Sequence, residues 1–469
     1  MTTFNPITIS CFKAYDVRGE LDVNLDNAIA YRIGRAFAQY LNDGKDNPVI
    51  VVGSDIRPSS ESLKQSVIDG ITDAGVDVID LGMVGTEEVY FATSYHNAIG
   101  GIEVTASHNP INYNGLKMVR ENSRPISGDT GLADIRAIAE RGEFVVADKG
   151  KVTLNTDKTA YIDKLMSFTD TAKFTPKKIV VNSGNGSAGP VVDELQKRLG
   201  DNIELIKVHH VPDGSFPNGI PNPMIIANQK VTSEAVIAHG ADFGVAFDGD
   251  FDRCFLFDEH GQFIEGSYIV GMLTEVFLKK HQGESIVYDP RVIYNTENVI
   301  TQNGGTPAIS KSGHSFIKQV MRETGAIYGG EMSAHHYFRD FAYCDSGMIV
   351  WLLVIELLSV TGKTLSELVN GYIHDFPSSG ELNFRLGQKT ATEISELLEQ
   401  KYHALNPAKN TLDGLSLDFG SWRFNLRSSN TEPLIRLNIE TKGDKELLKE
   451  RTDEILAVLN ECGAASANH

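Results

Sequence analysis

Asp248, Asp250 and Asp252 alternate along the sequence DGDFDR, directly after the apolar residues 243–247. Their carboxylates can converge on one hard cation, and Gly249 allows the chain to turn tightly between them. Three anions so close together repel one another unless a divalent ion compensates their charge. Mg²⁺ is the expected ion, because it binds few protein carboxylates and leaves room for a phosphate oxygen.

A calcium-binding EF-hand is the first alternative for this acidic segment, since Glu259 stands at the twelfth position of such a loop. Arg253, however, stands where that loop needs glycine, and residues 243–247 and 254–257 are typical of strands rather than helices. A solvated acidic turn would account for one or two aspartates, but poorly for three after a buried strand. The sequence therefore favours a magnesium site.

Ser107 lies in a second polar loop, TASHNP, which follows the strand-like residues 101–104. Most serines in such loops only hydrogen-bond the backbone. A serine phosphate beside Mg²⁺ is a workable covalent intermediate, so the acidic segment favours Ser107 as the carrier of a phosphoryl group. His108 and Lys117 lie near in the sequence and could bind phosphate or move a proton, although single residues of these types are more often surface groups.

Glu331 and Ser333 alternate in a third loop, GGEMSAHH, which also follows a strand-like run. Both side chains can therefore face one ligand, and a carboxylate paired with a hydroxyl suits the vicinal hydroxyls of a sugar. A simple glycine-rich turn is the alternative. His335 and His336 are not expected to form a metal pair, because neighbours on an extended chain point apart.

A fourth loop, RSSNTEP at residues 427–433, combines a guanidinium with hydroxyls, an amide and backbone N–H groups, and Arg436 follows it. These are the donors that a phosphate monoester needs, although a generic turn is the alternative. Two further loops supply weaker candidates: Tyr15, Arg18, Lys311 and His314.

The elements that must position these loops alternate along most of the chain. Strand-like runs such as 49–52 and 286–288 are separated by segments of helical period such as 27–41 and 60–74. This alternation predicts doubly wound parallel sheets, with ligand loops at the carboxyl ends of strands. The last part differs, because it mixes helices and strands in a small α+β unit. We expect three α/β domains and a C-terminal α+β domain, with bounds at 1–150, 151–255, 256–375 and 376–469.

The bulk composition excludes several classes of protein. A net charge of −19 over 469 residues argues against nucleic acid and anionic membranes as partners. No apolar run spans a bilayer, and residues 348–360 are better interpreted as a buried helix that contains Glu356. The four cysteines form no CxxC pair, which disfavours a disulfide framework or a zinc site. With no secretory signal pattern, a cytoplasmic protein is expected.

Four segments resemble the motifs of the α-D-phosphohexomutase family in their order and separations: residues 105–110, 248–253, 330–335 and 427–433. The resemblance covers residues 12 to 436. Within the family, segments 12–19 and 337–348 are most similar to the bacterial phosphomannomutase branch. The resemblance implies three related α/β domains and a smaller C-terminal domain around a central cleft.

The resemblance also implies a reaction and a role for each candidate residue. Hexose 6-phosphate and 1-phosphate would interconvert through a phosphoserine and a hexose 1,6-bisphosphate, which would also be the activator. Hexose phosphates would be the partners of a monomer or homodimer. The implied catalytic residues are Ser107, Arg18, Lys117 and His108. The implied Mg²⁺ ligands are Ser107, Asp248, Asp250 and Asp252. The implied substrate contacts are Tyr15, Arg253, Lys311, His314, Glu331, Ser333, His335, Arg427, Ser429, Asn430 and Thr431.

Mannose phosphates that feed GDP-mannose and surface polysaccharide are the favoured substrates. Activity on glucose phosphates is an alternative, because the two sugars differ only at C2 while Glu331 and Ser333 would contact C3 and C4. Phosphoglucosamine mutase is less favoured, because Met332 stands where that branch usually has glutamine. A sugar phosphatase would have little use for a remote phosphate loop. A scaffold without activity is disfavoured, because every reactive position is filled.

Overall fold

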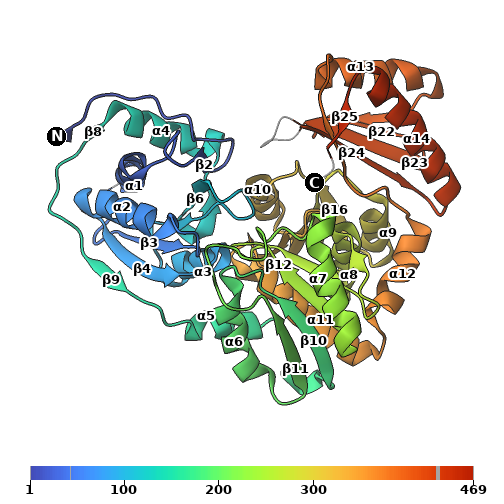
Figure 1. Cartoon of the computed structure of the whole chain (residues 1–469), viewed down its shortest axis with the longest axis horizontal. Helices are drawn as coiled ribbons and strands as arrows, with labels where there is room; N and C mark the ends of the chain where they lie inside the picture. The colour runs from blue at the N-terminus through green and yellow to red at the C-terminus, as the bar shows by residue number, and fades with distance from the viewer. Residues whose placement is uncertain (1, 43, 429–433, 468–469) are drawn as a thin grey trace. The chain divides into compact units, whose positions relative to one another are not determined.

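The computed structural model describes residues 2–42, 44–428 and 434–467 (Figure 1). The chain forms two compact units. The first consists of Met1–Phe263 with His336–Gly362, and the second of Ile264–His335 with Lys363–His469.

A seven-stranded sheet organises the first part of the first unit, with the order β2-β6-β5-β3-β4-β9 and β7 paired to β6. Strands β4, β3, β5 and β9 run parallel to their neighbours in that group, whereas β6 is antiparallel to both β5 and β2. The strands are β2 (Val17–Glu20), β3 (Val49–Ser54), β4 (Asp77–Met83), β5 (Gly100–Val104), β6 (Tyr113–Arg120), β7 (Arg124–Pro125) and β9 (Val152–Leu154).

Helices cover this sheet on both faces, as strand β3 demonstrates. Ile50 and Val52 of β3 belong to the core that includes residues of α1 and α2, whereas Val51 belongs to a separate core with Val89 of α3. Because successive side chains of a strand point to opposite faces, this part of the chain is doubly wound, as predicted. The helices are α1 (Asn27–Leu41), α2 (Ser60–Asp73), α3 (Thr86–Tyr95) and α4 (Leu132–Arg141), and a short pair joins β1 (Thr2–Thr3) to β8 (Glu143–Phe144).

A second sheet of the first unit contains β11, β10, β12 and β13 in that order. β10 is parallel to β11 and β12, whereas β13 is antiparallel to β12. Helix α7 packs against β10 and β12 (Figure 1). The elements here are α5 (Thr159–Met166), β10 (Lys177–Asn182), α6 (Ala188–Leu199), β11 (Ile203–Val208), α7 (Ile226–His239), β12 (Phe243–Phe247) and β13 (Cys254–Phe257). Residues 336–362 of the first unit add the antiparallel pair β18 (His336–Phe338) and β19 (Cys344–Asp345), which is not part of this sheet, and helix α11 (Gly347–Thr361).

The two sheets are mixed, which corrects the expectation of purely parallel sheets. In each, a parallel strand is followed by an antiparallel neighbour through a short loop, so no crossover helix is needed. Residues 105–112 connect β5 to β6, and residues 248–253 connect β12 to β13. These two loops contain the serine and the aspartates singled out from the sequence.

The second unit contains the parallel strands β15, β16 and β17 and a separate C-terminal sheet. The α/β elements are α8 (Gly266–Lys280), β15 (Ser285–Tyr288), α9 (Tyr294–Gln302), β16 (Thr306–Ile309), α10 (His314–Thr324), β17 (Tyr328–Gly330) and α12 (Leu365–Asp375). A short strand, β14 (Phe263–Ile264), lies where the two units join in sequence.

The C-terminal sheet has the order β21-β22-β23-β24-β20-β25, and its pairs are antiparallel. Helices α13 and α14 contribute to its core through Ile394, Leu398, Ile455 and Leu459 (Figure 1). This confirms the predicted α+β character. The elements are β20 (Leu382–Arg385), α13 (Ala391–Tyr402), β21 (Ala408–Asn410), β22 (Leu415–Asp418), β23 (Trp422–Ser428), β24 (Leu434–Thr441), α14 (Lys445–Glu461) and β25 (Ala465–Ser466).

Within the described residues, no single helix is both long and apolar enough to cross a bilayer. The successive helices α11 and α12 pass a test of length and composition only when they are taken together. Helix α11 is buried along most of its length, as expected from the apolar run that contains Glu356.

Candidate active site

Ser107 follows strand β5 and is held in a conformation that L-residues rarely adopt. Its φ angle is +48°, in the left-handed region, and the residue is only 4% exposed. The Ser107 N–H donates to Thr105 Oγ1 at 2.8 Å, and the Ser107 carbonyl accepts from Arg57 Nη2 at 2.9 Å. Both peptide groups of the serine are thus bound by side chains, and its hydroxyl is left to point toward the acidic loop.

The Ser107 hydroxyl donates to Asp248 Oδ2 at 2.7 Å, which joins the two loops predicted from the sequence. One oxygen from each of Asp248, Asp250 and Asp252 lies within 4.8 Å of the other two, and all three residues are buried. Gly249 is essential to this approach. A Cβ atom at that position would lie 2.5 Å from the Ser107 carbonyl oxygen, closer than real contacts allow.

The surroundings of the three carboxylates fit a divalent cation. Lys117 on β6 places its Nζ 2.7 Å from Asp250 Oδ2 and also donates to Asp252 Oδ2, so an ammonium group already lies among these anions. The buried Oδ1 of Asp250 receives no hydrogen bond from any described residue. Hard carboxylate oxygens in this arrangement are what Mg²⁺ prefers.

The charged groups at this site shift one another's pKa values. Burial alone would lower the pKa of Lys117, but the carboxylates of Asp250 and Asp252 outweigh burial and raise that pKa above its ordinary value. Burial likewise opposes ionisation of Asp250, and Lys117 outweighs it, so the pKa of Asp250 falls below its ordinary value. Lys117 is therefore cationic and Asp250 anionic at neutral pH.

His108 is a neutral neighbour of Ser107. Its Nδ1 lies 3.0 Å from Ser107 Oγ and also contacts Arg253 Nη2. A guanidinium can only donate, so Nδ1 of His108 is the acceptor in the second contact. Burial, followed by the charge of Arg253, holds the pKa of His108 well below its usual range. Arg253 also binds Asp248 Oδ2 through Nη2 at 2.7 Å, so it fixes the first aspartate of the triplet.

Arg18 on β2 reaches the same serine loop. Its Nη1 donates to Asn109 Oδ1 at 3.1 Å, and its Nη2 donates to Asp16 Oδ2 at 3.0 Å. Tyr15, on the preceding loop, is half-buried. The structure thus brings Arg18 to the loop that carries Ser107 and His108, and its catalytic role stays a prediction.

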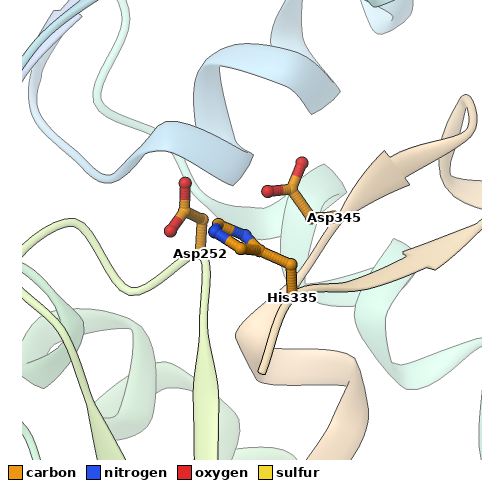
Figure 2. Close-up of side chains that lie close together, drawn as sticks. All are labelled: Asp252, His335 and Asp345. Carbon is orange, nitrogen blue, oxygen red and sulfur yellow. The ribbon is translucent and has the colours of Figure 1, made fainter. Parts of the chain in front are cut away.

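Figure 2 shows a further carboxylate beside one member of the triplet: the side chains of Asp252 and Asp345 lie close together. One oxygen of each is within 4.8 Å of the other, and both residues are buried in the first unit. The sequence offered no signal for Asp345. His335 is also labelled in Figure 2. It is half-buried and is the last residue of the segment Ile264–His335 of the second unit.

In the second unit, Glu331 and Ser333 lie together as predicted, and Arg291 joins them. Arg291 Nη2 lies 3.5 Å from Glu331 Oε1 and donates to Ser333 Oγ at 3.2 Å. Glu331 Oε1 also accepts from the Gly313 N–H at 2.8 Å, which brings in the loop of Lys311 and His314. Glu331, Ser333 and Arg291 therefore form one cluster, and the loop that carries Lys311 and His314 is joined to it through the backbone of Gly313.

Arg427 is bound to a carboxylate that the sequence analysis did not single out. Glu381 accepts from Arg427 Nη2 at 3.1 Å and from Arg436 Nη1 at 3.2 Å, and its Oε2 lies 3.4 Å from Arg291 Nη1. Burial would raise the pKa of Glu381, but the three arginines outweigh it and hold that pKa below its ordinary value. The predicted phosphate ligands Ser429, Asn430 and Thr431 lie outside the described residues.

Four family models match consecutive parts of the chain: phosphoglucomutase/phosphomannomutase alpha/beta/alpha domain I at residues 10–146, domain II at 159–261, domain III at 265–376 and the C-terminal domain at 381–458. The chain belongs to the phosphoglucomutase/phosphomannomutase family. The predicted family and the predicted α/β fold class are both confirmed.

Relatives within the phosphoglucomutase/phosphomannomutase family align over nearly the whole chain. A phosphomannomutase of Salmonella montevideo is 56% identical, and the alignment covers 96% of this chain and 99% of that protein. A phosphomannomutase of Escherichia coli K12 is 55% identical over 97% of this chain and 99% of the relative. A crystal structure of a family protein from Burkholderia thailandensis matches with a TM-score of 0.86 at 32% identity, covering 98% of this chain and 100% of that one.

Two pairs of residues missed by the sequence analysis, one pair in each unit of this family member, support its functional loops. Asp55 and Arg57 follow β3, and Asp289 and Arg291 follow β15. The signal was a repeated Asp-x-Arg after an apolar strand. Thr86 at the start of α3 was also missed, and its hydroxyl donates to Asp250 Oδ2 at 2.6 Å.

Proposed function

We propose that the protein is a phosphomannomutase that interconverts mannose 6-phosphate and mannose 1-phosphate. The observation that carries this proposal is the 2.7 Å hydrogen bond from Ser107 to Asp248 within a buried aspartate triplet. Relatives that carry this name at 55–56% identity over nearly their full length support the choice of activity. Their mutase chemistry places the protein in the isomerase class.

The reaction begins with Ser107 as a phosphoserine. The O6 hydroxyl of mannose 1-phosphate attacks phosphorus, the bond from phosphorus to Ser107 Oγ breaks, and a bond to O6 forms. Ser107 Oγ takes up a proton as O6 loses one, and mannose 1,6-bisphosphate results. After this intermediate turns end for end, Ser107 Oγ attacks the phosphate on C1, loses its proton, and mannose 6-phosphate is released with a proton on O1.

The groups around Ser107 suit this transfer. Lys117 and Arg253 are buried cations that can neutralise charge on the phosphoryl oxygens. The Ser107 hydroxyl donates to Asp248 Oδ2 at 2.7 Å, so this carboxylate is placed to accept the serine proton when Ser107 attacks. The neutral His108, 3.0 Å from Ser107 Oγ, is proposed to contact the phosphoryl group. Mg²⁺ held by Ser107 phosphate and the three aspartates would add Lewis-acid stabilisation of that charge. Arg18 fixes the serine loop through Asn109 and is available to a phosphate oxygen.

Glu331 and Ser333 are proposed to bind sugar hydroxyls, and Arg427 the phosphate that is not transferred. Arg427 Nε is buried and donates to no acceptor among the described residues, so its N–H is available to an anion. The remaining proposed substrate contacts are Tyr15, Arg253, Lys311, His314, His335, Ser429, Asn430 and Thr431. Five further statements stay predictions: a hexose 1,6-bisphosphate as activator, cytoplasmic localisation, a monomer or homodimer, the central cleft and a role in GDP-mannose supply. So do the four domain bounds, of which the one at 255/256 would divide strand β13.

A direct test replaces the serine and follows both products. Ser107→Ala is expected to abolish isomerisation of mannose 1-phosphate, whereas Ser62→Ala, at an exposed serine of α2, should keep full turnover. Assays on mannose 1-phosphate, glucose 1-phosphate and glucosamine 1-phosphate in parallel rank the substrates. Normal turnover by Ser107→Ala would refute the assignment. Inorganic phosphate released as fast as substrate disappears would establish a phosphatase instead.

A further inference from the structure

We propose that Asp55 and Arg57 are positioning residues for phosphoryl transfer, which hold Ser107 in its reactive conformation without contacting the substrate. This inference rests on the proposed function, because it assigns a role in the chemistry of Ser107. Neither residue belongs to the four segments that carry the family resemblance.

Arg57 binds the serine loop through its backbone. Its Nη2 donates to the carbonyl oxygens of Ser107 and Asn109, and its Nη1 donates to those of Pro110 and Tyr113, at 2.9 and 3.2 Å. Arg57 is only 2% exposed. A planar guanidinium with donors on two sides can serve several carbonyls at once, which a lysine ammonium cannot do with the same geometry. One side chain therefore sets the path of the whole loop.

Asp55 fixes the other side of the serine. Its Oδ2 accepts from the Thr105 hydroxyl at 2.7 Å, and Thr105 Oγ1 in turn accepts from the Ser107 N–H at 2.8 Å. Asp55 Oδ1 also accepts from the Arg57 N–H at 2.9 Å, and Oδ2 lies 3.5 Å from Arg57 Nε. The N–H and the carbonyl of Ser107 are thus both tied to one turn, residues 55–57.

This anchoring is needed because Ser107 has a positive φ. A non-glycine residue in that region is strained and persists only where its surroundings enforce it. Relaxation of φ would swing the Ser107 hydroxyl away from Asp248. It would also move the Ser107 carbonyl, which lies so close to residue 249 that a Cβ atom added there would be 2.5 Å from its oxygen.

The same Asp-x-Arg arrangement recurs in the second unit, which argues against a chance contact. The Arg291 N–H donates to Asp289 Oδ1 at 2.9 Å, as Arg57 does to Asp55. Asp289 Oδ2 accepts from the Met332 N–H at 2.8 Å, and Arg291 reaches Glu331 and Ser333. In both places an Asp-x-Arg turn at the end of a strand supports the functional loop that follows a neighbouring parallel strand.

The test compares Arg57→Lys with Arg32→Lys. Arg32 is a matched control, because it is also buried and donates to backbone carbonyls, those of Asn5 and Ala139, away from the serine loop. Both variants keep the positive charge. For Arg57→Lys we expect kcat to fall about 100-fold with KM unchanged, the size of effect that a shift of about 1 Å can produce. Arg32→Lys should keep the wild-type kcat.

A second measurement follows the serine itself. Intact-mass spectrometry gives the rate at which Ser107 gains phosphate from glucose 1,6-bisphosphate, and this rate should fall in Arg57→Lys in parallel with kcat. If Arg57→Lys is not folded by circular dichroism, Thr105→Val replaces it, with Thr105→Ser as the conservative variant that should restore phosphorylation. This pair keeps Arg57 in place and removes only the hydroxyl between Asp55 and Ser107.

The outcomes separate the two proposals. Active wild type with equal kcat values for Arg57→Lys and Arg32→Lys would overturn the positioning role alone. So would equal phosphorylation rates for Thr105→Val and Thr105→Ser. A wild-type protein that neither accepts phosphate on Ser107 nor isomerises any hexose phosphate would overturn the proposed function, and this inference with it.

Discussion

Lys117 Nζ lies 2.7 Å from Asp250 Oδ2 and among the carboxylates that suit a divalent ion. In the metal-free protein this ammonium balances the charges of Asp250 and Asp252, while Arg253 binds Asp248. A metal ion and Lys117 compete for the same oxygens, and the stability of the protein should depend on which of them is present.

Replacement of Lys117 by methionine should test this competition. Loss of one partner of a buried ion pair costs about 3–5 kcal/mol, so the metal-free variant should unfold at a lower temperature than the wild type. Added Mg²⁺ should recover most of that loss and should stabilise the variant more than the wild type. Lys64→Met is the control, because buried Lys64 pairs with Glu61 and Asp80 instead. Recovery of both variants by Mg²⁺ to the same extent would contradict the idea.

Gly249→Ala should impair both stability and turnover. Its Cβ would lie 2.5 Å from the Ser107 carbonyl oxygen, and the rigid backbone there cannot move aside without moving the serine. The expected loss in the free energy of unfolding is about 1–3 kcal/mol, as for other overpacked sites. Gly371→Ala in α12 is the control, because nothing lies within 4 Å of its added Cβ. There alanine should stabilise the helix by about 1 kcal/mol. Urea unfolding and kcat measure both effects.

Glu87 should make stability depend on pH. The carboxylate accepts from Tyr161, from the Ser346 hydroxyl and from two backbone N–H groups at the start of α11. Burial outweighs these hydrogen bonds and raises the pKa of Glu87 from 4.5 to about 8.

The folded protein therefore binds a proton at Glu87 that the unfolded chain releases, and stability is lost as pH rises from 4.5 to about 8. Glu87→Gln removes this contribution. The free energy of unfolding of this variant should therefore fall less than that of the wild type over the same pH interval. Identical slopes for the two proteins, by urea unfolding at several pH values, would show that Glu87 titrates normally.

Glu381→Gln should expose the mutual repulsion of three arginines. Arg291, Arg427 and Arg436 share this buried carboxylate, so its neutralisation removes the negative charge between them, and Arg291 keeps only Asp289 and Glu331 as partners. The variant should have a lower Tm and a higher KM for hexose phosphates. Inorganic phosphate should raise its Tm more than that of the wild type, because the anion restores the missing negative charge. A phosphate effect of equal size in both proteins would argue against an anion site here.

The sequence was most informative where the signal is local. The strand at 243–247 and the helix at 27–41 occur with the predicted bounds, because period and flanking turn residues define them. The meeting of Ser107 with the aspartate triplet was also predictable, since both loops follow apolar strands and their residues share one chemistry.

Contacts that depend on strand order could not be predicted in this way. Arg57 acts on a loop fifty residues away in sequence because β3 lies beside β5, and neither motif nor spacing indicates that neighbour. Glu381 was missed for the same reason, since its arginines come from β23, β24 and the loop after β15. The antiparallel return strands β6 and β13 also carry no sequence signal that separates them from parallel ones.

The pairing of β5 with β6 sets the permitted length of the connection that carries the serine. Lys117 stands opposite Glu103 in that register, and alternate positions of β6 point to opposite sides of the sheet. Insertion or deletion of a single residue between 107 and 113 would slide β6 by one place and turn the ammonium of Lys117 away from Asp250. Loops that carry function usually tolerate changes of length, but the register of β6 predicts that this connection tolerates substitutions better than insertions or deletions.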